Sequence, residues 1–560
     1  MIVLALAMVT CDAARVSGQV VSLAQRPAPP EAIAAPPPAQ SATGPGPTRL
    51  PSPSQSMVGP PVGAMSIPAN PPPRPADVMT GPLLSDRGPA KVLPPGEPAP
   101  SDRPLPINLA TALRLSNGRP LLIAAAQARV QIAAAQAEKA NVLWLPNLDA
   151  GSAYIRHTGG IQNTNGNLLV DSTNSFIAGG GAVLRVGTAD AYFEPLAARQ
   201  VLVARRIDTQ TARNEALEIT AESYFNVQMA RGTYSAMTDA TTKADDVVRR
   251  VESLARGLVA PDEIERARTL KAELEQSTQI ARQQWRVSSA NLTRVLRLDP
   301  AAVIVPLEPD HLQVTLIEPS WMVDDLIVVG LMNRPELASS RAIVRANIIR
   351  LQRERLRPLM PSLLVTGNGT PDFYFQGGIY ATGTNGSLNQ WAGRGDVAAQ
   401  AVWQLDNLGF GYQAKVREQR GETELANIEL FNTQDHVAAE VAQAKADVDS
   451  ATMRVVQAET GLKQGLESYR GNLIGLGQTQ RFNDILTLVN RPQEVVASLQ
   501  QLQQAYVNYY RTVADFNRAQ FRLFYALGFP AEALACRRPP GPIEPVDTYR
   551  GPALPNVRGQ

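Results

Sequence analysis

The sequence predicts a mostly α-helical fold made of two tandem repeats, each of which combines a long helical hairpin with a β-hairpin. Three observations predict it. A pair of proline turns recurs with equal spacing, apolar residues alternate with period two after each second proline, and long helical stretches without proline follow. The order of these features is the same in both halves of the 560-residue chain.

The amino-acid composition excludes several classes of protein. Lys and Arg number 53 and Asp and Glu 51, and a net charge of +2 argues against a general nucleic-acid-binding protein. No run of 18 or more apolar residues occurs, which excludes a membrane-spanning helix. Two cysteines and three widely separated histidines offer neither a disulfide scaffold nor a thiolate zinc cluster. We therefore expect no enzyme activity, no cofactor and no metal site.

Both ends of the chain are expected to lie outside the fold. Residues 1–25 are a signal-like leader with an apolar run that ends at Cys11, so we expect export, either with a simple cleaved leader or with a lipid on Cys11. Residues 26–106 hold roughly 25 of the 45 prolines and predict a disordered linker, and residues 531–560 predict a disordered tail. The two repeats are expected at 107–320 and 321–530.

Paired proline turns define the repeat. Asn117-Gly118-Arg119-Pro120 has its counterpart in Met332-Asn333-Arg334-Pro335. A helical stretch follows each turn and ends at a second proline 26 residues further on, Pro146 or Pro361. Two equal spacings with matching residue types predict an internal duplication.

Alternating segments follow each second proline. Between residues 397 and 406 the apolar face carries Trp403 and the more polar face carries Gln404, and residues 176–186 alternate in the first repeat. The pattern predicts strands of about ten residues joined by polar loops at 157–174 and 371–394. We expect Trp403 to face lipid or the bilayer interface and Gln404 to face a water-filled lumen.

A long helix and a returning helix come next in each repeat. The outgoing helices are predicted at 196–256 and 412–474, and the returning helices at 262–298 and 483–527. At 1.5 Å per residue each outgoing helix is about 90 Å long. The returning helix and the helix before the strands together have nearly that length, so we expect them to lie end to end along the outgoing helix.

Four strands of this kind cannot close a membrane barrel, because the smallest closed transmembrane barrels have about eight strands. An open sheet edge is not tolerated in lipid. Several chains must therefore share one β-barrel if the strands lie in a membrane. The alternative is a soluble hairpin packed on the helical rod.

Short motifs occur in a specific order over residues 107–530. They are the helix at 107–113, the two proline turns, the helix-to-strand switches Leu145-Pro146-Asn147-Leu148 and Met360-Pro361-Ser362-Leu363, and the helix ends at 296–300 and 525–530. In the order and spacing of these motifs the chain resembles the TolC-like family of outer-membrane efflux proteins.

The resemblance implies a homotrimeric α/β barrel duct in the cell outer membrane, in contact with its lipid and with no nucleic acid. Each protomer would give four strands to a shared barrel of 12, and the helices would continue as a tunnel through the periplasm. It also implies passive export of drugs, metals or proteins in a tripartite efflux or type I secretion system. An inner-membrane pump and a periplasmic adaptor protein would deliver these substrates.

The resemblance implies that the helical-hairpin tips contact the adaptor. These tips correspond to six residues: Gly257, Leu258, Val259, Leu476, Gly477 and Thr479. The alternative is that the tip glycines only cap antiparallel helices in the left-handed conformation.

Carboxylates that narrow the tunnel are implied at Glu263 and Asp484, with Thr487 where the family often has a further acid. Alternatively, both acids begin a returning helix and stabilise it through its macrodipole. A second function class also stays open from the residues alone, namely an exported periplasmic coiled-coil scaffold without a pore. The strand alternation favours the channel.

Overall fold

The computed structural model describes residues 79–85, 93–118, 120–162, 164–254, 259–366, 377–395, 397–482 and 485–529. Contacts divide the chain into two units, Met1–Ile67 and Pro68–Gln560, and every described residue belongs to the second. Several predictions fall outside the described residues: the leader with Cys11, most of the proline-rich linker, the tail, Gly257, Leu258 and Asp484.

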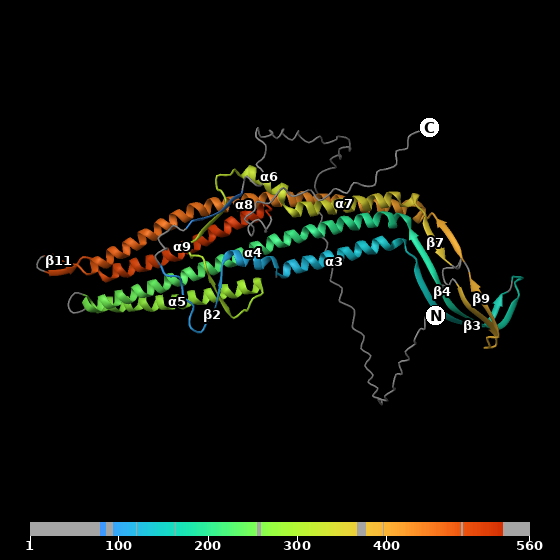
Figure 1. Ribbon diagram of the computed structural model, residues 1–560, viewed down its shortest axis with the longest axis horizontal. Coiled ribbons are helices and arrows are strands. Elements are labelled where there is room, and N and C mark those ends of the chain that lie inside the picture. Colours follow the sequence, from blue (N-terminus) through green and yellow to red (C-terminus); the bar gives the residue numbers. More distant parts are fainter. Residues whose placement is uncertain are drawn as a thin grey trace, which may run out of the picture. The chain divides into compact units, whose positions relative to one another are not determined.

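Two long helices dominate the second unit (Figure 1). α4 spans Thr188–Leu254 and α8 spans Phe410–Leu476, and each has 67 residues, or about 100 Å at 1.5 Å per residue. α4 begins before Pro195, which lies inside the helix, whereas the helix was predicted to begin after this proline. Among the described residues, none of the helices combines the length and the apolar character that a membrane span needs.

Shorter helices lie along both long helices in the same order. Along α4 these are α2 (Leu109–Gly118), α3 (Leu121–Asn141) and α5 (Pro261–Leu296), and along α8 they are α6 (Val323–Asn333), α7 (Pro335–Leu356) and α9 (Pro492–Ala526). α3 and α5 together have 57 residues, and so do α7 and α9. The predicted end-to-end pairing beside each long helix is confirmed.

The helices are arranged side by side in one row. α7 and α9 contact α4 as well as α8, so the order across the row is α3/α5, α4, α7/α9 and α8. Short 3-10 turns, η2 (Val142–Trp144) and η3 (Arg357–Leu359), lead from α3 and α7 into the strands. The helix pair α3/α5 and the helix α8 therefore stand at the two ends of the row.

One predicted boundary is wrong. The second returning helix was expected from residue 483, but α9 begins at Pro492, whose fixed φ and missing N–H suit a first helical turn. The preceding residues form an antiparallel hairpin of β11 (Thr479–Phe482) and β12 (Ile485–Leu488). The prediction that the second returning helix begins at Asp484 is therefore wrong, because the helix starts at Pro492 and Asp484 itself lies outside the described residues.

A single antiparallel sheet adjoins the helices at the η2 and η3 end. Its strands are β3 (Asn147–Gln162), β4 (Leu168–Gly187), β7 (Ser362–Thr366), β8 (Gly377–Thr384), β9 (Gln390–Gly395) and β10 (Ala398–Val402). β3 pairs with one edge of β4, and β7 and β8 pair in succession with its other edge. β10 and β9 then pair with β7 and β8, which makes the sheet four strands wide.

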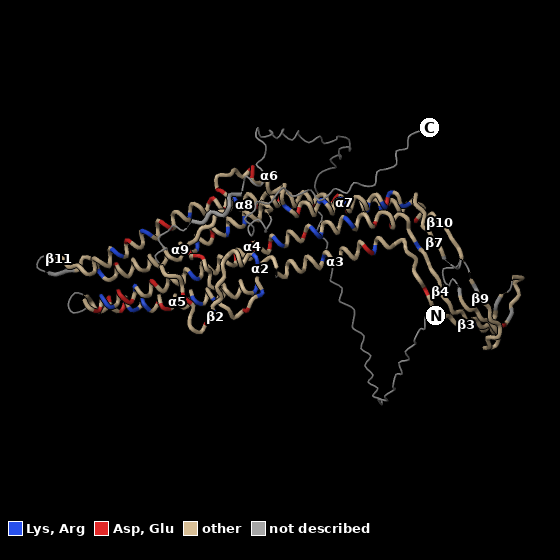
Figure 2. The backbone as a smooth tube through the Cα atoms, viewed as in Figure 1, with Lys and Arg blue, Asp and Glu red and all other residues tan. Residues whose placement is uncertain are grey.

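The register gives the sheet an apolar face, because residues directly opposite each other share a face. Leu184 lies opposite Val365, which lies opposite Ala399, and Val186, Leu363 and Ala401 form the next such row. On the other face Arg185, Leu364 and Gln400 are aligned. Figure 2 shows that charged residues are frequent along the helices and sparse on the strands.

The predicted strand at 397–406 is shorter than expected. β10 ends at Val402, so Trp403 and Gln404 lie beyond the paired residues. The Trp403 side chain is 62% exposed. The backbone carbonyl of Gln404 accepts a hydrogen bond from the Tyr412 hydroxyl at 2.7 Å, which directs the chain into α8 instead of along the sheet.

The folded body begins earlier than the predicted residue 107. β1 (Met79–Ser85) pairs antiparallel with β6 (Gln313–Ile317), and β2 (Arg103–Ile107) pairs parallel with β5 (Ala302–Pro306). In β2, Pro104 and Pro106 alternate with residues that keep their N–H groups. All backbone N–H donors of β2 therefore point to the same edge of the strand. The other edge needs no strand partner for its N–H groups, so this proline-rich sequence can form an edge strand.

Side chains of the helices attach these strands to the row. On α9, the Asn517 amide accepts from the Val314 N–H and donates to the Leu312 carbonyl, both at 2.8 Å. Gln520 accepts from two further N–H groups of β6 at 3.0 Å. The edge of β6 that faces α9 is thus satisfied by amide side chains instead of a strand.

A buried ion pair connects α4 with the segment between β5 and β6. The side chains of Arg231 and Asp310 are 5% and 6% exposed, with 2.9 Å between Nε and Oδ1. Arg231 also donates to the Pro306 carbonyl. Burial raises the pKa of Asp310 to about 6 although Arg231 lowers it, so desolvation of the carboxylate outweighs its attraction to the guanidinium.

Breaking this pair on one side should destabilise the protein more than removing both charges. Asp310→Leu leaves the Arg231 guanidinium buried without a counter-ion and should lower the free energy of unfolding by about 3–5 kcal/mol. The double variant Arg231→Met/Asp310→Leu should lose clearly less. Thermal unfolding in detergent, followed by circular dichroism, measures both. A double variant that is as unstable as Asp310→Leu, or less stable than it, would contradict the prediction.

Glu218 on α4 should make stability depend on pH near neutrality. Burial, followed by the nearby Glu440, raises its pKa from 4.5 to about 7. The folded protein then binds a proton between pH 4.5 and 7 that the unfolded chain has released, so this group lowers stability as the pH rises through that window. Glu218→Gln should reduce the fall in Tm between pH 5 and pH 8. Replacing the exposed Glu424 by Gln is the control and should leave the fall unchanged.

Candidate functional site

The turn between α4 and α5 is the first predicted tip. α4 ends at Leu254 and α5 begins at Pro261, with Ala260 in the extended conformation before it. Val259 packs against the apolar cluster between the helices, and Ile264 lies against the same cluster. Of the three residues predicted here, Val259 alone is described, and it contributes to the packing of the tip.

Glu263 lies in the first turn of α5, where the sequence placed it. Its Oε1 accepts a hydrogen bond from Arg266 at 3.0 Å, and its Oε2 is buried without a hydrogen-bond partner among the described residues. A carboxylate in a first helical turn stabilises the helix by about 0.3–1 kcal/mol through the macrodipole. The geometry of Glu263 thus fits the helix-start interpretation, with Arg266 compensating part of its charge.

The second tip has a different geometry from the predicted glycine cap. Leu476 ends α8 and is buried, and Gly477 has φ −83°, so it is not in the left-handed conformation. The close approach is at Gly475 instead, because a Cβ there would lie 2.4 Å from Nδ2 of Asn490 and would displace that side chain. Asn490 donates its N–H to the Gly475 carbonyl and its Nδ2 to Asn472 Oδ1, at 3.3 and 3.0 Å.

The hairpin β11–β12 closes this second tip. Thr479 pairs with Leu488, and the Val489 N–H donates to the Gln478 carbonyl at 2.9 Å. The tip residue Thr479 is therefore held on a strand, not on a helix. Residues 485–488 are a short, mostly apolar run, and four residues are too few for periodicity to distinguish a strand from a helix.

The two tips lie next to each other. A groove of about 450 Å³ runs between the start of α5 and the start of α9, with Asp262, Arg266 and Glu273 on one side and Val496 and Gln500 on the other. The structure therefore places Val259 and Glu263 at the same end of the row as Leu476, Gly477 and Thr479.

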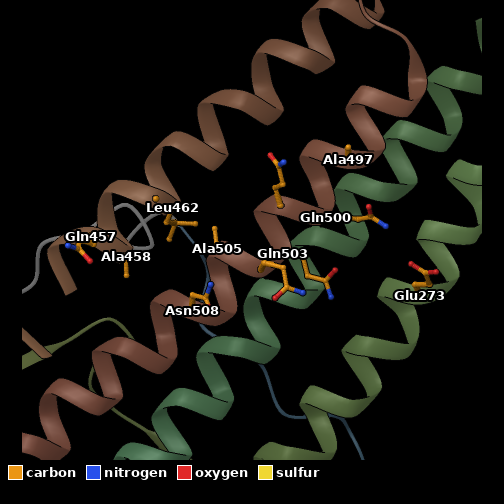
Figure 3. Close-up of a pocket in the computed structure, with 12 residues that line it drawn as sticks. Glu273, Gln457, Ala458, Leu462, Ala497, Gln500, Gln503, Ala505 and Asn508 are labelled. Atoms are coloured by element: carbon orange, nitrogen blue, oxygen red, sulfur yellow. The ribbon is translucent and has the colours of Figure 1, made fainter. Parts of the chain in front are cut away.

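A larger groove of about 830 Å³ continues from this one along α8 and α9, away from the tips, and shares Glu273 and Gln500 with it (Figure 3). Its lining consists of amide side chains, small or apolar residues and one acid: Gln457, Gln500, Gln501, Gln503, Gln504, Asn508, Ala458, Gly461, Leu462, Ala497, Ala505 and Glu273. Figure 3 shows Gln457 and Leu462 on α8 across from Ala505 and Asn508 on α9. Amides both donate and accept hydrogen bonds, so the groove suits contact with polypeptide and not acid–base chemistry.

Comparisons by sequence find no matching family model and no matching curated protein. Solved structures do match. The Campylobacter jejuni CmeC outer membrane channel is 15% identical, with 75% of this chain and 85% of that chain covered at a TM-score of 0.56. The outer membrane protein VceC from Vibrio cholerae is 13% identical, with 75% and 96% covered at 0.58.

A third match is the structure of CusC. It is 16% identical, and 80% of this chain and 99% of that chain are covered at a TM-score of 0.59. At such identities the likeness concerns the fold. The chain has the TolC-like fold of the outer-membrane efflux channels, as the motif order predicted.

Proposed function

We propose that this chain is the outer-membrane channel of an efflux system, a homotrimeric exit duct that passes substrates passively from the periplasm to the outside. An inner-membrane pump and a periplasmic adaptor protein deliver these substrates, in a tripartite efflux or type I secretion system. The observation that carries the proposal is the four-strand-wide sheet, which has an apolar face and two open edges.

The open edges require further chains. β3, with 16 residues, is the strand at one edge, and β9 and β10 form the other, with no further strand partner among the described residues. Unpaired backbone groups are too costly in lipid, so a sheet whose apolar face meets a membrane must close on itself. Three chains supply 12 strands, a size that closed membrane barrels adopt.

The two ends of the helical row also carry exposed apolar surfaces that could pack against a second copy of the chain. On α8, Leu425, Ile428 and Phe431 are exposed large apolar residues, and on α3 so are Leu121 and Ile132. α8 of one protomer would pack against α3/α5 of the next. Such a head-to-tail contact uses two different surfaces, and it generates a ring when its rotation closes.

The tips are proposed as the contact with the adaptor, through Val259, Gly477 and Thr479 together with Gly257 and Leu258, while the buried Leu476 supports the tip from inside. The amide-rich groove further along α8 and α9 supports this, since it continues the surface of the tips and offers donors and acceptors without a strong charge. The alternative is a periplasmic scaffold without a pore, and it does not explain why the sheet has an aligned apolar face. We therefore favour the channel.

The purified protein should be a trimer whose stability depends on the exposed face of α8. Crosslinking or native mass spectrometry in detergent should show a three-chain species. Phe431→Glu places a charge in the proposed contact and should shift the protein toward monomers, whereas Phe431→Leu keeps the apolar surface and should stay trimeric. A monomeric, monodisperse wild-type protein would refute the assembly.

Asp484 is proposed to narrow the tunnel, together with Glu263. A ring of carboxylates attracts cations, so Asp484→Asn should lower cation preference and block by divalent cations in single-channel recordings. Asp435→Asn is the matched control, because this exposed acid lies on α8 about 60 Å before Leu476 at 1.5 Å per residue. Unchanged selectivity and block in Asp484→Asn would remove this residue from the pore.

A further inference from the structure

A pocket of about 530 Å³ lies at the opposite end of α8 from the tips, where α7 ends and α8 begins. Arg355 lines it from α7, and Arg417 and Arg420 line it from α8. Leu405 and Tyr412 form part of its apolar wall. Because α8 begins directly after the strands, this pocket adjoins the sheet.

The pocket is positively charged. Arg355, Arg417 and Arg420 are exposed, and none of them has an acidic partner within ion-pair distance among the described residues. The one acid in the lining, Glu354, is buried, and its oxygens accept hydrogen bonds from Arg353 and Arg357 at 2.9–3.0 Å. The carboxylate closest to the pocket is therefore already compensated by two guanidinium groups.

Other nearby acids are also engaged. Asp406 pairs with Lys415 at 2.9 Å, and Asp190 accepts two hydrogen bonds from Arg357 at 2.6 and 2.9 Å. Three arginines thus converge on one pocket without a free carboxylate among the lining residues. Guanidinium groups in this arrangement suit a phosphate, which they can bind through paired N–H groups.

An apolar rim accompanies the charge. Trp403, Leu405, Leu408 and Phe410 follow one another between the end of β10 and the start of α8, and all four are exposed, Leu408 by 86%. The turn η4 (Asp406–Gly409) presents Leu408 with φ 58°. The left-handed backbone conformation is unfavourable for leucine. The turn therefore holds an apolar side chain toward the outside in spite of this backbone strain.

Inorganic phosphate would not contact the apolar rim. A zwitterionic headgroup would place its own positive group near three arginines, which would repel it. We propose that the pocket binds the phosphate headgroup of an anionic glycerophospholipid, with the acyl chains lying over the rim. The lipid would fix the depth of the sheet in the periplasmic leaflet. This inference rests on the proposed function, because it requires the sheet to lie in the outer membrane.

Native mass spectrometry of the full-length protein in neutral detergent tests the proposal. With equal amounts of dioleoylphosphatidylglycerol and dioleoylphosphatidylcholine, the wild type should bind mainly the anionic lipid. Each arginine near an anionic headgroup contributes about fivefold, so Arg355→Gln/Arg417→Gln/Arg420→Gln should lose the preference almost entirely. Arg294→Gln/Arg470→Gln/Arg511→Gln is the matched control, since it removes three exposed arginines elsewhere and should keep the preference.

Three outcomes overturn the lipid site: equal binding of both lipids by the wild type, the same loss in the control variant, or displacement of the anionic lipid by excess inorganic phosphate. Channel conductance in phosphatidylcholine bilayers separates this proposal from the proposed function. Both the wild type and the pocket variant should conduct there. Conductance without any lipid preference removes the lipid site alone, whereas a wild type that neither inserts nor conducts removes the proposed function.

Discussion

Close packing against the small residues of α4 is the interaction on which the rest of the structure depends. α4 contacts α3 and α5 on one side and α7 and α9 on the other. Ala204, Ala221, Ala236 and Ala240 are fully buried along it, and a Cβ at Gly232 would lie 2.5 Å from the Tyr510 ring. A helix of 67 residues gains most of its stability from such lateral contacts, since propensity alone is marginal in water. Without them the row of helices, and the sheet it carries, would have no support.

The middle of the row is held by a second, chemically different kind of packing. There the short strands β1, β2, β5 and β6 lie across the helices, and large side chains fill the space, among them Trp285, Tyr224 and Phe524. Trp285 donates its indole N–H to the Ile304 carbonyl at 2.9 Å, so an apolar contact also satisfies a backbone acceptor. The segment before β2 is held by Asp102, which pairs with Arg282 and Arg286.

The two ends of the row differ in chemistry in a way that fits different surroundings. Near the tips the grooves are lined by amides and small side chains, which suit contact with another polypeptide. At the junction with the sheet, arginines that have no acidic partner in the described part of the chain adjoin exposed tryptophan, leucine and phenylalanine. Aromatic and basic residues in that combination are typical of a membrane interface. The chemistry of each end therefore supports a duct that meets a protein at one end and lipid at the other.

Local periodicity and motif order were enough to predict the fold, with its two long helices, their shorter partners and the strands after Pro146 and Pro361. Only the tertiary contacts fix where residues 79–85 and 103–107 belong, because β1 pairs Met79 with Ile317 and β2 pairs Arg103 with Ala302. They also decided that β11 and β12 precede α9 and that Arg355 meets Arg417 and Arg420 in one pocket. The composition of a segment indicates whether it can remain in contact with water. It does not show whether a proline-rich strand or an arginine pocket forms, because both depend on contacts with residues far away in the sequence.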